Sequence, residues 1–335
     1  MAANYGDDSD SSDISFHGHF IELEKDTRVI DVESDIDVPF SDSDHEASSS
    51  DEETVNLPVF NCDRWCDATS PVEVEPFVED CGPVHVLDVN ADPFDYFSLI
   101  VNEDFYQLAV DQTNLYAVQR QEITGNADKY WVPVTPSEIR LYMHINILMG
   151  IVVLPQYKMY WSTDDRLNQV GVSKCMSRNR FAKISQYFHL NDSRNQFPKG
   201  HRNYDPLYKV RPFLDMVKRN IASCYRPGRD ISVDEAMIPY TGRLNFKQYI
   251  KGKPNPWGIK VWCAADSVTG YLLNFDVYVG AVHDPMPYGS GHYVVCKVGE
   301  PYLHKYHFYY DNYFASLQLA VDLLDKKTYS CSTIR

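Results

Sequence analysis

The sequence predicts an α/β protein in which a helical half precedes a sheet-rich half. Between Pro93 and Pro227, apolar residues recur at the three- and four-residue spacing of helices. At Pro227 and Gly228 the spacing changes, and the segments from Ile231 onward alternate or cluster in β-branched and aromatic runs. One further helix is predicted after Ser316, which is a good N-cap residue.

Three helices of the first half have distinct signals. Thr135 and Glu138 form a capping box, with Pro136 at the first helical position. Two later helices carry an apolar stripe, with Lys and Arg residues outside it. The stripes consist of Phe181, Ile184 and Phe188 in one helix and of Val210, Phe213, Leu214, Val217 and Ile221 in the other. We expect both stripes to pack on the core.

The second half contains short runs of strand-forming residues separated by turn signals. A strand is predicted to open at residues 231–234, and residues 266–270 form a good turn between the two strands of a hairpin. The hairpin strands cover residues 259–264 and 271–279, and two later strands cover residues 304–310 and 328–334.

The formal charge of −16 is distributed unevenly along the chain. Residues 1–55 hold 17 Asp and Glu against two basic residues, a net charge of −15. Residues 178–260 hold 17 Lys and Arg against six acidic residues, a net charge of +11. The basic segment favours a polyanionic partner, because cationic side chains release counterions from phosphates. A well-solvated basic face is the alternative.

Two segments precede the helices. Residues 1–55 are dominated by Asp, Glu and Ser, which bury too little apolar surface to offset the entropy of ordering, and they are predicted to be a disordered acidic tail. Residues 56–92 are predicted to be an extended linker because their prolines favour extended backbone. These prolines are Pro58, Pro71, Pro76 and Pro83.

Composition excludes some other classes of protein. No apolar run approaches the roughly 18 residues of a membrane span, and the amino terminus does not resemble a signal peptide, so we expect an intracellular, soluble protein without a membrane partner. The eight cysteines are scattered. No Cys or His pair follows Cys62 and Cys66 at zinc-site spacing, so we expect reduced thiols and set aside a metal site with Cys81.

Two aspartates have positions suited to catalysis. Asp234 follows a short β-prone run, and Asp311 ends an aromatic strand before a helix cap. Carboxylates at the ends of neighbouring strands converge on one point, and hard cations such as Mg²⁺ select oxygen ligands. Two such ions activate water and stabilise the leaving oxygen during displacement at phosphorus. The alternative is that both residues are ordinary cap or turn residues.

A series of short motifs surrounds these aspartates. The motifs include Ser232-Val233-Asp234-Glu235, Gly242-Arg243, Phe246-Lys247-Gln248-Tyr249-Ile250, Lys253-Pro254, Gly258-Ile259-Lys260-Val261-Trp262, Thr269-Gly270-Tyr271 and Tyr310-Asp311-Asn312-Tyr313-Phe314. Upstream lie Asp95-Tyr96-Phe97, Thr113-Asn114-Leu115-Tyr116-Ala117, Met149-Gly150, Tyr160-Trp161-Ser162 and Arg178-Asn179-Arg180-Phe181. In order and approximate spacing, they resemble the piggyBac transposase family over residues 93–335. Each fragment is weak alone, but together they are specific.

The resemblance implies a fold and a chemistry. Family members have a helical dimerisation and DNA-binding domain, which falls on residues 93–230 here. A ribonuclease H-like catalytic domain follows and falls on residues 231–335. They use three aspartates and Mg²⁺ to cut and join double-stranded DNA at TTAA targets, and they act as dimers. The first and second aspartates fall on Asp234 and Asp311, while the third would lie beyond Arg335 together with a zinc-binding tail.

The resemblance and the charge pattern together predict DNA-contacting residues. Phosphate contacts are expected from basic side chains near the aspartates and on one basic helix. These residues are Arg243, Lys247, Lys251, Lys253 and Lys260 near the aspartates and Arg178 and Arg180 on the helix. For the residues near the aspartates, a solvated hairpin is the alternative.

The expected function is that of a nuclear, transposase-derived DNA-binding protein with two of three catalytic aspartates. Its ribonuclease H-like sheet is expected to be incomplete, and completion of transposition by the chain alone is not expected. The expected partners are double-stranded DNA and either a second copy or a full-length relative. The alternatives are an active transposase represented by a truncated gene model and a domesticated interaction protein that uses neither DNA nor metal.

Overall fold

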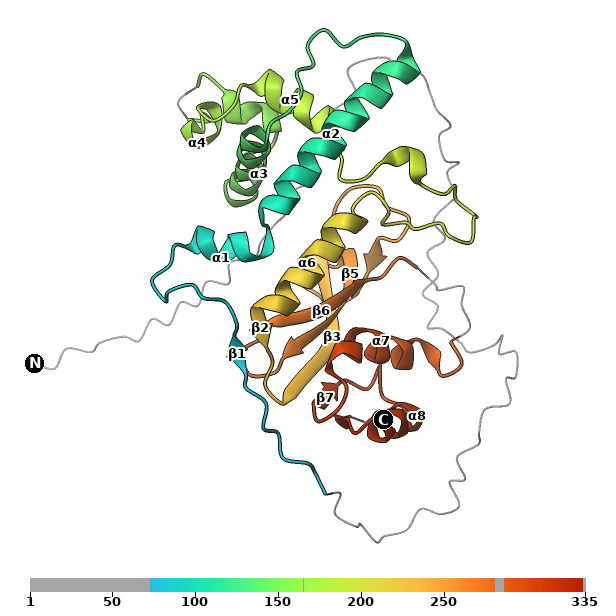
Figure 1. The fold of residues 1–335 in the computed structure, drawn as a ribbon. Helices are drawn as coiled ribbons and strands as arrows, with labels where there is room; N and C mark the ends of the chain where they lie inside the picture. Colours follow the sequence, from blue (N-terminus) through green and yellow to red (C-terminus); the bar gives the residue numbers. More distant parts are fainter. Residues whose placement is uncertain (1–72, 165, 281–285, 334–335) are drawn as a thin grey trace, which may run out of the picture.

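The computed structural model describes residues 73–164, 166–280 and 286–333. The predicted acidic tail at residues 1–55 and the first part of the predicted linker lie outside these ranges. The described residues form a helical half and a sheet-bearing half, which lie one above the other in Figure 1. No helix in the described ranges is both long enough and apolar enough to cross a membrane.

Helices make up the first half of the described chain. The longest are α2 and α3, and shorter α-helices and 3-10 helices follow α3. The bounds are α1 (Pro93–Ile100), α2 (Glu103–Thr124), α3 (Pro136–Ile151), η2 (Tyr157–Trp161), α4 (Val170–Ser173), α5 (Arg178–Tyr187) and η3 (Ser193–Asn195). The predicted capping box is confirmed, since the Thr135 hydroxyl accepts the Glu138 N–H and the Glu138 carboxylate accepts the Thr135 N–H.

The core of the helical half forms where these helices cross. Phe105 from α2, Ile139 and Ile145 from α3, and Phe181 and Ile184 from α5 are buried together. The stripe predicted on α5 therefore packs inward, with the boundary residue Phe188 packed at the margin of the same cluster.

A mixed six-stranded sheet forms most of the second half. Strands run in the order β4-β5-β3-β7-β8, and β6 pairs with the same edge of β5 as β4 does. β5 lies antiparallel to β3, β4 and β6, whereas β7 is parallel to both β3 and β8. The bounds are β3 (Asp230–Pro239), β4 (Gln248–Tyr249), β5 (Trp257–Asp266), β6 (Leu272–Val277), β7 (His307–Tyr310) and β8 (Tyr329–Ser332). The predicted strands are thus present, and β7 and β8 are shorter than predicted.

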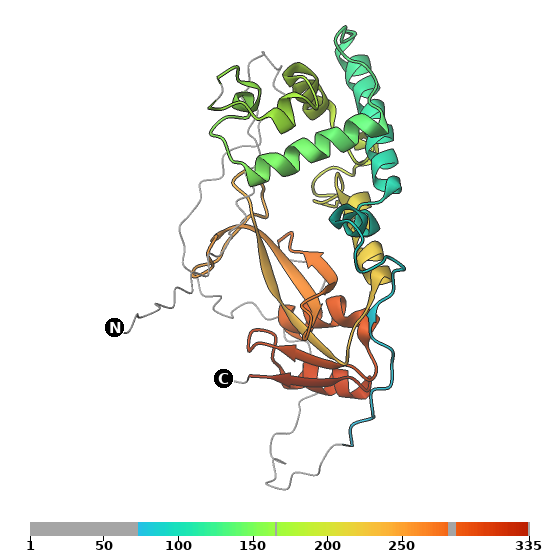
Figure 2. The same ribbon diagram turned by 90° about the vertical axis from the view of Figure 1, so that its left-hand side faces the viewer.

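Helices cover both faces of this sheet. On one face, α7 (Gly289–Gly299) and α8 (Leu317–Asp325) pack on β3 and β7 and bury residues such as Val233 and Phe308. On the other face, α6 (Arg211–Cys224) packs through Ile221 on Val261 and Phe275 of β5 and β6. Figures 1 and 2 show α6 running along the sheet from the helical half. Because α6 also contributes Met216 to the helical core, it joins the two halves.

The turn between β5 and β6 has the structure that the sequence predicts. The buried Asp266 carboxylate accepts the N–H groups of Gly228, Val268 and Thr269. Gly270 has a φ of 71°, a left-handed conformation that favours glycine. The carboxylate therefore holds the hairpin turn against the start of the sheet.

The sequence did not indicate helix α7. Its three glycines lower intrinsic helix propensity, and tertiary packing requires two of them. A Cβ on Gly291 would lie 2.9 Å from the Phe314 Cα, and one on Gly299 would lie 2.2 Å from the Phe308 ring. Close approach of α7 to β7 and to the turn after it therefore requires glycine at these two positions.

An irregular segment, residues 73–84, runs from the sheet toward the helical half. Its β1 (Gly82–Pro83) pairs with β2 (Tyr225–Arg226) just after α6. At the sheet end, the Tyr329 hydroxyl accepts the Glu75 N–H at 3.1 Å and donates to the Glu73 carbonyl at 3.2 Å. The segment is therefore attached to β8 and to the short strand between α6 and β3.

Candidate active site

Asp234 and Asp311 lie side by side at the same end of the sheet. Strands β3 and β7 run parallel, and their last paired residues are Val233 and Tyr310. Each aspartate directly follows one of these residues, Asp234 within β3 and Asp311 just after the end of β7. Adjacent strands are about 4.8 Å apart. The fold thus brings together the two aspartates that the sequence singled out, while their catalytic role and carboxylate separation stay predictions.

Each carboxylate is oriented by a backbone N–H group and remains exposed. The Glu235 N–H donates to Asp234 Oδ1 at 2.8 Å, and the Tyr313 N–H donates to Asp311 Oδ1 at 2.9 Å. The Phe314 N–H also donates to the Asp311 carbonyl, so the chain turns sharply after β7. Among the residues that the structure describes, the second oxygen of each carboxylate has no hydrogen bond or ion pair. Each carboxylate therefore retains an oxygen for a ligand.

Lys260 on β5 places a positive charge beside this pair. Its Nζ lies 3.8 Å from the centroid of the Trp262 ring and 5.2 Å from that of the Tyr313 ring. The negative faces of the two rings hold the ammonium group by cation–π interaction. Tyr313 lies two residues after Asp311. The turn after β7 therefore provides both one carboxylate of the pair and one of the rings that contact Lys260.

Burial and neighbouring charges act on Lys260 in opposite directions. Partial burial is the largest effect and lowers the pKa of its ammonium group. The carboxylates of Glu235, Asp234 and Asp311 raise the pKa and so only partly offset the burial. The net pKa is below the ordinary value for lysine. A desolvated ammonium group beside carboxylates is suited to bind a phosphate, because its charge is weakly screened.

A long connection from β3 to β5 carries most of the predicted DNA-contacting residues. We call residues 240–256, including β4, the basic arm. Lys247 donates from Nζ to the Gly242 carbonyl at 3.1 Å, and Lys253 forms an ion pair with Glu235 at 3.3 Å. Arg243 and Lys251 are exposed and have no ion pair or hydrogen bond to other described residues. Their role in DNA contact stays a prediction.

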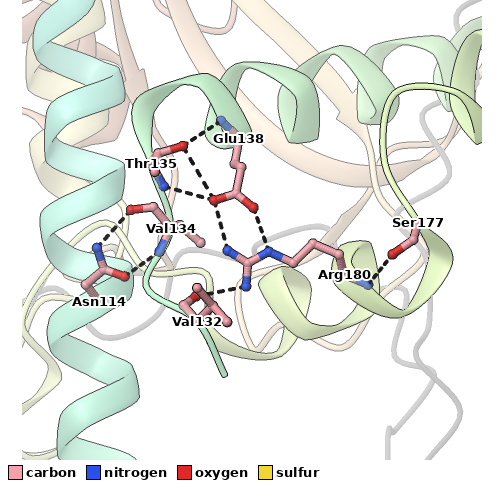
Figure 3. Close-up of polar contacts among 7 residues, drawn as sticks. All are labelled: Asn114, Val132, Val134, Thr135, Glu138, Ser177 and Arg180. Atoms are coloured by element: carbon pink, nitrogen blue, oxygen red, sulfur yellow. Dashed lines mark hydrogen bonds and ion pairs between the residues drawn. The ribbon is translucent and has the colours of Figure 1, made fainter. Parts of the chain in front are cut away.

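Arg180 holds together three segments of the helical half. Its guanidinium forms two hydrogen bonds with the Glu138 carboxylate, at 2.7 and 2.9 Å, and a third with the Val132 carbonyl. Figure 3 shows that this carboxylate is the one in the capping box of α3. Arg178, two residues earlier, is exposed and has no ion pair among the described residues. Both remain predicted DNA contacts, although Arg180 already has protein acceptors.

Other acidic residues of the sheet half have structural partners. Asp276 forms ion pairs with Lys218 and Lys297, which connects α6 and α7 to β6. Asp322 accepts from His292 Nε2 at 2.7 Å and so joins α8 to α7. These two carboxylates stabilise the packing of helices on the sheet.

The carboxylate oxygens at this end of the sheet provide some of the ligands that a hard divalent cation needs. Asp234 and Asp311 offer exposed carboxylate oxygens of the kind that Mg²⁺ prefers. Within residues 73–164, 166–280 and 286–333, no group of three or more His, Cys, Asp or Glu residues could hold a metal ion. All six cysteines in these ranges are free, whereas Cys62 and Cys66 lie outside them.

The sequence did not indicate that aromatic rings surround the Lys260 ammonium group. Trp262 is buried, and its ring also contacts the lysine ammonium group. The signal available was the Tyr310-Asp311-Asn312-Tyr313-Phe314 motif, in which an aromatic residue follows the aspartate.

Comparison with known proteins identifies the family. A family model described as Transposase IS4 matches residues 92–335. Human PiggyBac transposable element-derived protein 3 is 29% identical over 280 residues, which cover 81% of this chain and 44% of that protein. Human PiggyBac transposable element-derived protein 2 is 27% identical over 260 residues, which cover 75% of this chain and 42% of that protein. The chain belongs to the piggyBac-type transposase family.

A solved structure supports the same conclusion at the level of fold. The piggyBac transposase in a synaptic complex with hairpin DNA matches with a TM-score of 0.62 and 26% sequence identity. The match covers 77% of this chain and 54% of the transposase chain. The α/β class and the ribonuclease H-like character of the piggyBac-type sheet are thereby confirmed. This chain spans about half the length of these piggyBac relatives or less.

Proposed function

We propose that this chain is a piggyBac transposase-derived DNA-binding protein that acts in the nucleus. In this proposal, Asp234 and Asp311 provide two of three carboxylates of a magnesium site, and the 335-residue chain does not complete transposition alone. The observation that carries the proposal is the parallel register of β3 and β7, in which Asp234 and Asp311 each directly follow a residue of the last pair. Lys260 and the basic arm lie beside them.

The chemistry assigned to each group follows from its surroundings. Asp234 and Asp311 would hold Mg²⁺, which when bound supplies charge stabilisation at a phosphoryl group. Lys260 binds a phosphate oxygen next to the aspartates, since its ammonium group is held in place by two rings. Arg243 and Lys251 contact phosphates farther along the DNA, because both are exposed and carry no competing ion pair with described residues.

The proposed partner is double-stranded DNA with TTAA-type targets. Support comes from the related transposase, whose structure is a complex with hairpin DNA. The net charge of +11 in residues 178–260 supports the same partner. We further propose that the helical half mediates association with a second copy or with a longer relative.

A binding and cleavage assay tests this function. A labelled duplex containing TTAA is titrated with the chain at about 50 and 200 mM salt, and affinity should fall steeply as salt rises. The same duplex is then incubated with Mg²⁺, and little or no strand cleavage is expected. Absence of binding at the lower salt would favour the interaction-protein alternative. Cleavage by the native chain, but not by Asp234→Ala, would show instead that this chain carries all the catalytic residues that strand cleavage needs.

A further inference from the structure

Two exposed aromatic rings lie opposite each other where the basic arm joins β5. Tyr249 in β4 and Trp257 in β5 are register partners in an antiparallel pair. Their ring centroids lie 5.0 Å apart at an interplanar angle of 53°. The exposed fraction is 55% for Tyr249 and 43% for Trp257. The nearby Phe246 is 5% exposed, so the arm has a buried aromatic anchor of its own.

Positive charge surrounds this ring pair. Lys247 Nζ lies 5.3 Å from the centroid of the Trp257 ring, and Lys251 is exposed in the turn that follows β4. An exposed aromatic surface flanked by cations suits single-stranded nucleic acid, because bases stack on the rings while cations bind the phosphates. An apolar protein partner would not require this density of lysine.

The ring pair is also held in a fixed relation to the candidate active site. Trp257 begins the strand that carries Lys260. The Lys253–Glu235 ion pair ties the arm to β3 one residue beyond Asp234. At the base of the arm, a Cβ on Gly258 would lie 2.3 Å from the Ile238 carbonyl oxygen, so the strands approach closely there. The rings therefore lie at the braced junction between the basic arm and β5 rather than on an independent loop.

We propose that Tyr249 and Trp257 form a stacking surface for an unpaired base of DNA next to the candidate active site. The proposal rests on the DNA-binding function proposed above and adds a preference for DNA in which a base has left the duplex. Lys247 and Lys251 bind the phosphates that flank this base. Cross-strand aromatic pairs also stabilise hairpins, so the test must separate stacking on DNA from support of the arm.

Two DNA probes of equal length provide the test. One is fully paired, and the other has an unpaired 2-aminopurine within an otherwise identical duplex. The native chain should bind the second probe roughly tenfold more tightly, since stacking of one base on an aromatic side chain gives an effect of this order. Binding should also lower the 2-aminopurine emission, because the base stacks on a ring.

Matched variants distinguish the two roles of the rings. Tyr249→Leu and Trp257→Leu should remove the preference while affinity for the paired probe stays within about twofold. Tyr249→Phe should keep the preference, because it retains the ring. Tyr130→Leu is the control: Tyr130 is 70% exposed and has Lys129 Nζ 4.9 Å from its ring centroid, but it lies between α2 and α3. This control should keep the preference.

The possible outcomes distinguish the proposed stacking surface from the DNA-binding function on which it rests. Equal affinity of the native chain for both probes, with unchanged 2-aminopurine emission, would overturn the stacking surface alone. Retention of the preference by both leucine variants would do the same. Failure to bind either probe at low salt would overturn the DNA-binding function and this proposal with it.

Discussion

Asp234 on β3 and Asp311 directly after β7 take equivalent positions beside each other, each one residue beyond the pair formed by Val233 and Tyr310. Segments far apart in the sequence meet here because the chain returns through α7 and places β7 against β3 in parallel. The two carboxylates thus depend on different neighbours for their position. β5 supports the first through the Asp234–Cys263 register pair, and the turn packed on α7 supports the second.

The first prediction concerns metal binding by this pair. Asp234→Asn and Asp311→Asn should each weaken Mn²⁺ binding by at least about tenfold, because each removes one charged oxygen ligand. Binding can be followed by the electron paramagnetic resonance signal of free Mn²⁺. Asp325→Asn, a change at an exposed aspartate on α8, is the control and should bind as the native chain does. Equal affinity in all four proteins would rule out a site at the sheet end.

A second prediction concerns Lys260 and phosphate binding. Lys260→Met retains the apolar stem over Trp262 but removes the charge, so the salt slope of duplex binding should fall by about one. The lowered pKa of Lys260 also predicts a pH effect. As pH rises, this ammonium group loses its proton before ordinary lysines do, so native affinity should decline earlier than that of Lys260→Arg. Identical pH profiles for these two proteins would contradict the assignment.

Gly291 provides a third prediction, on how α7 positions Asp311. A Cβ at this residue would meet the Phe314 Cα and the Tyr313 carbonyl oxygen, each at 2.9 Å, and backbone atoms cannot yield as a flexible side chain can. Gly291→Ala should therefore destabilise the fold by about 1–3 kcal/mol. It should also weaken Mn²⁺ binding, because the turn after Asp311 must shift.

The control for this change is Gly150→Ala in α3, where a Cβ would have no neighbour within 4 Å. Alanine is favoured over glycine in a helix, so the control should stabilise the fold by about 0.5–1 kcal/mol. Urea denaturation measures both effects. If Gly291→Ala also stabilised the fold, the close approach of α7 to the turn would be wrong.

A fourth prediction tests the Arg180–Glu138 ion pair, whose side chains are 18% and 29% exposed. Burial alone would raise the pKa of Glu138, but hydrogen bonds and charge from Arg180 outweigh it and lower the pKa below the usual 4.5. Arg180→Met should cost about 1–3 kcal/mol near neutral pH, because it leaves a partly buried carboxylate without its partner.

The pH dependence of this effect has a definite sign. The folded pKa of Glu138 is depressed, so its contribution is complete above pH 4.5 and is lost as pH falls through the folded pKa. The difference in unfolding free energy between the native chain and Arg180→Met should therefore shrink toward acid. Urea denaturation at several pH values measures it, and Arg178→Met, a change at an exposed arginine of the same helix, is the control. A difference that grew toward acid would contradict the ion pair.

The sequence predicted the features that depend on local signals. The capping box at Thr135, the hairpin turn at Asp266 and the placement of Asp234 and Asp311 after β-prone runs can each be read from a few adjacent residues. The family was identified in the same way, from short motifs in order. Local signals of this kind predict the course of the backbone and the positions of Asp234 and Asp311.

Features that depend on packing between distant segments were not predictable in this way. Helix α7 contains glycines that reduce helix propensity, and only its contact with the turn after Asp311 explains Gly291. The pairing of Arg180 with Glu138 joins two helices, so a basic residue that suggested DNA contact also holds the helical half together. The rings around Lys260 come from β5 and the turn after β7, which periodicity alone does not bring together.

The last prediction concerns the acidic segment, residues 1–55, which lies outside the described ranges. Its net charge of −15 opposes that of residues 178–260, so it competes with phosphates for the same cations. Deleting it should strengthen duplex binding by roughly tenfold at about 50 mM salt, and the gain should shrink at about 200 mM as the charges are screened. Fluorescence anisotropy of a labelled duplex measures both conditions.

A third protein separates charge from chain length. In it, all acidic residues of the segment are replaced by Asn or Gln, so the length is kept while the negative charge is removed. If charge is the cause, this protein should bind DNA as the deleted form does, because the cations of the basic arm no longer have an internal competitor. If it binds as the native chain does, the segment weakens binding by occupying space, and the electrostatic explanation is wrong. If all three bind alike at low salt, the acidic segment does not act on the DNA-binding surface.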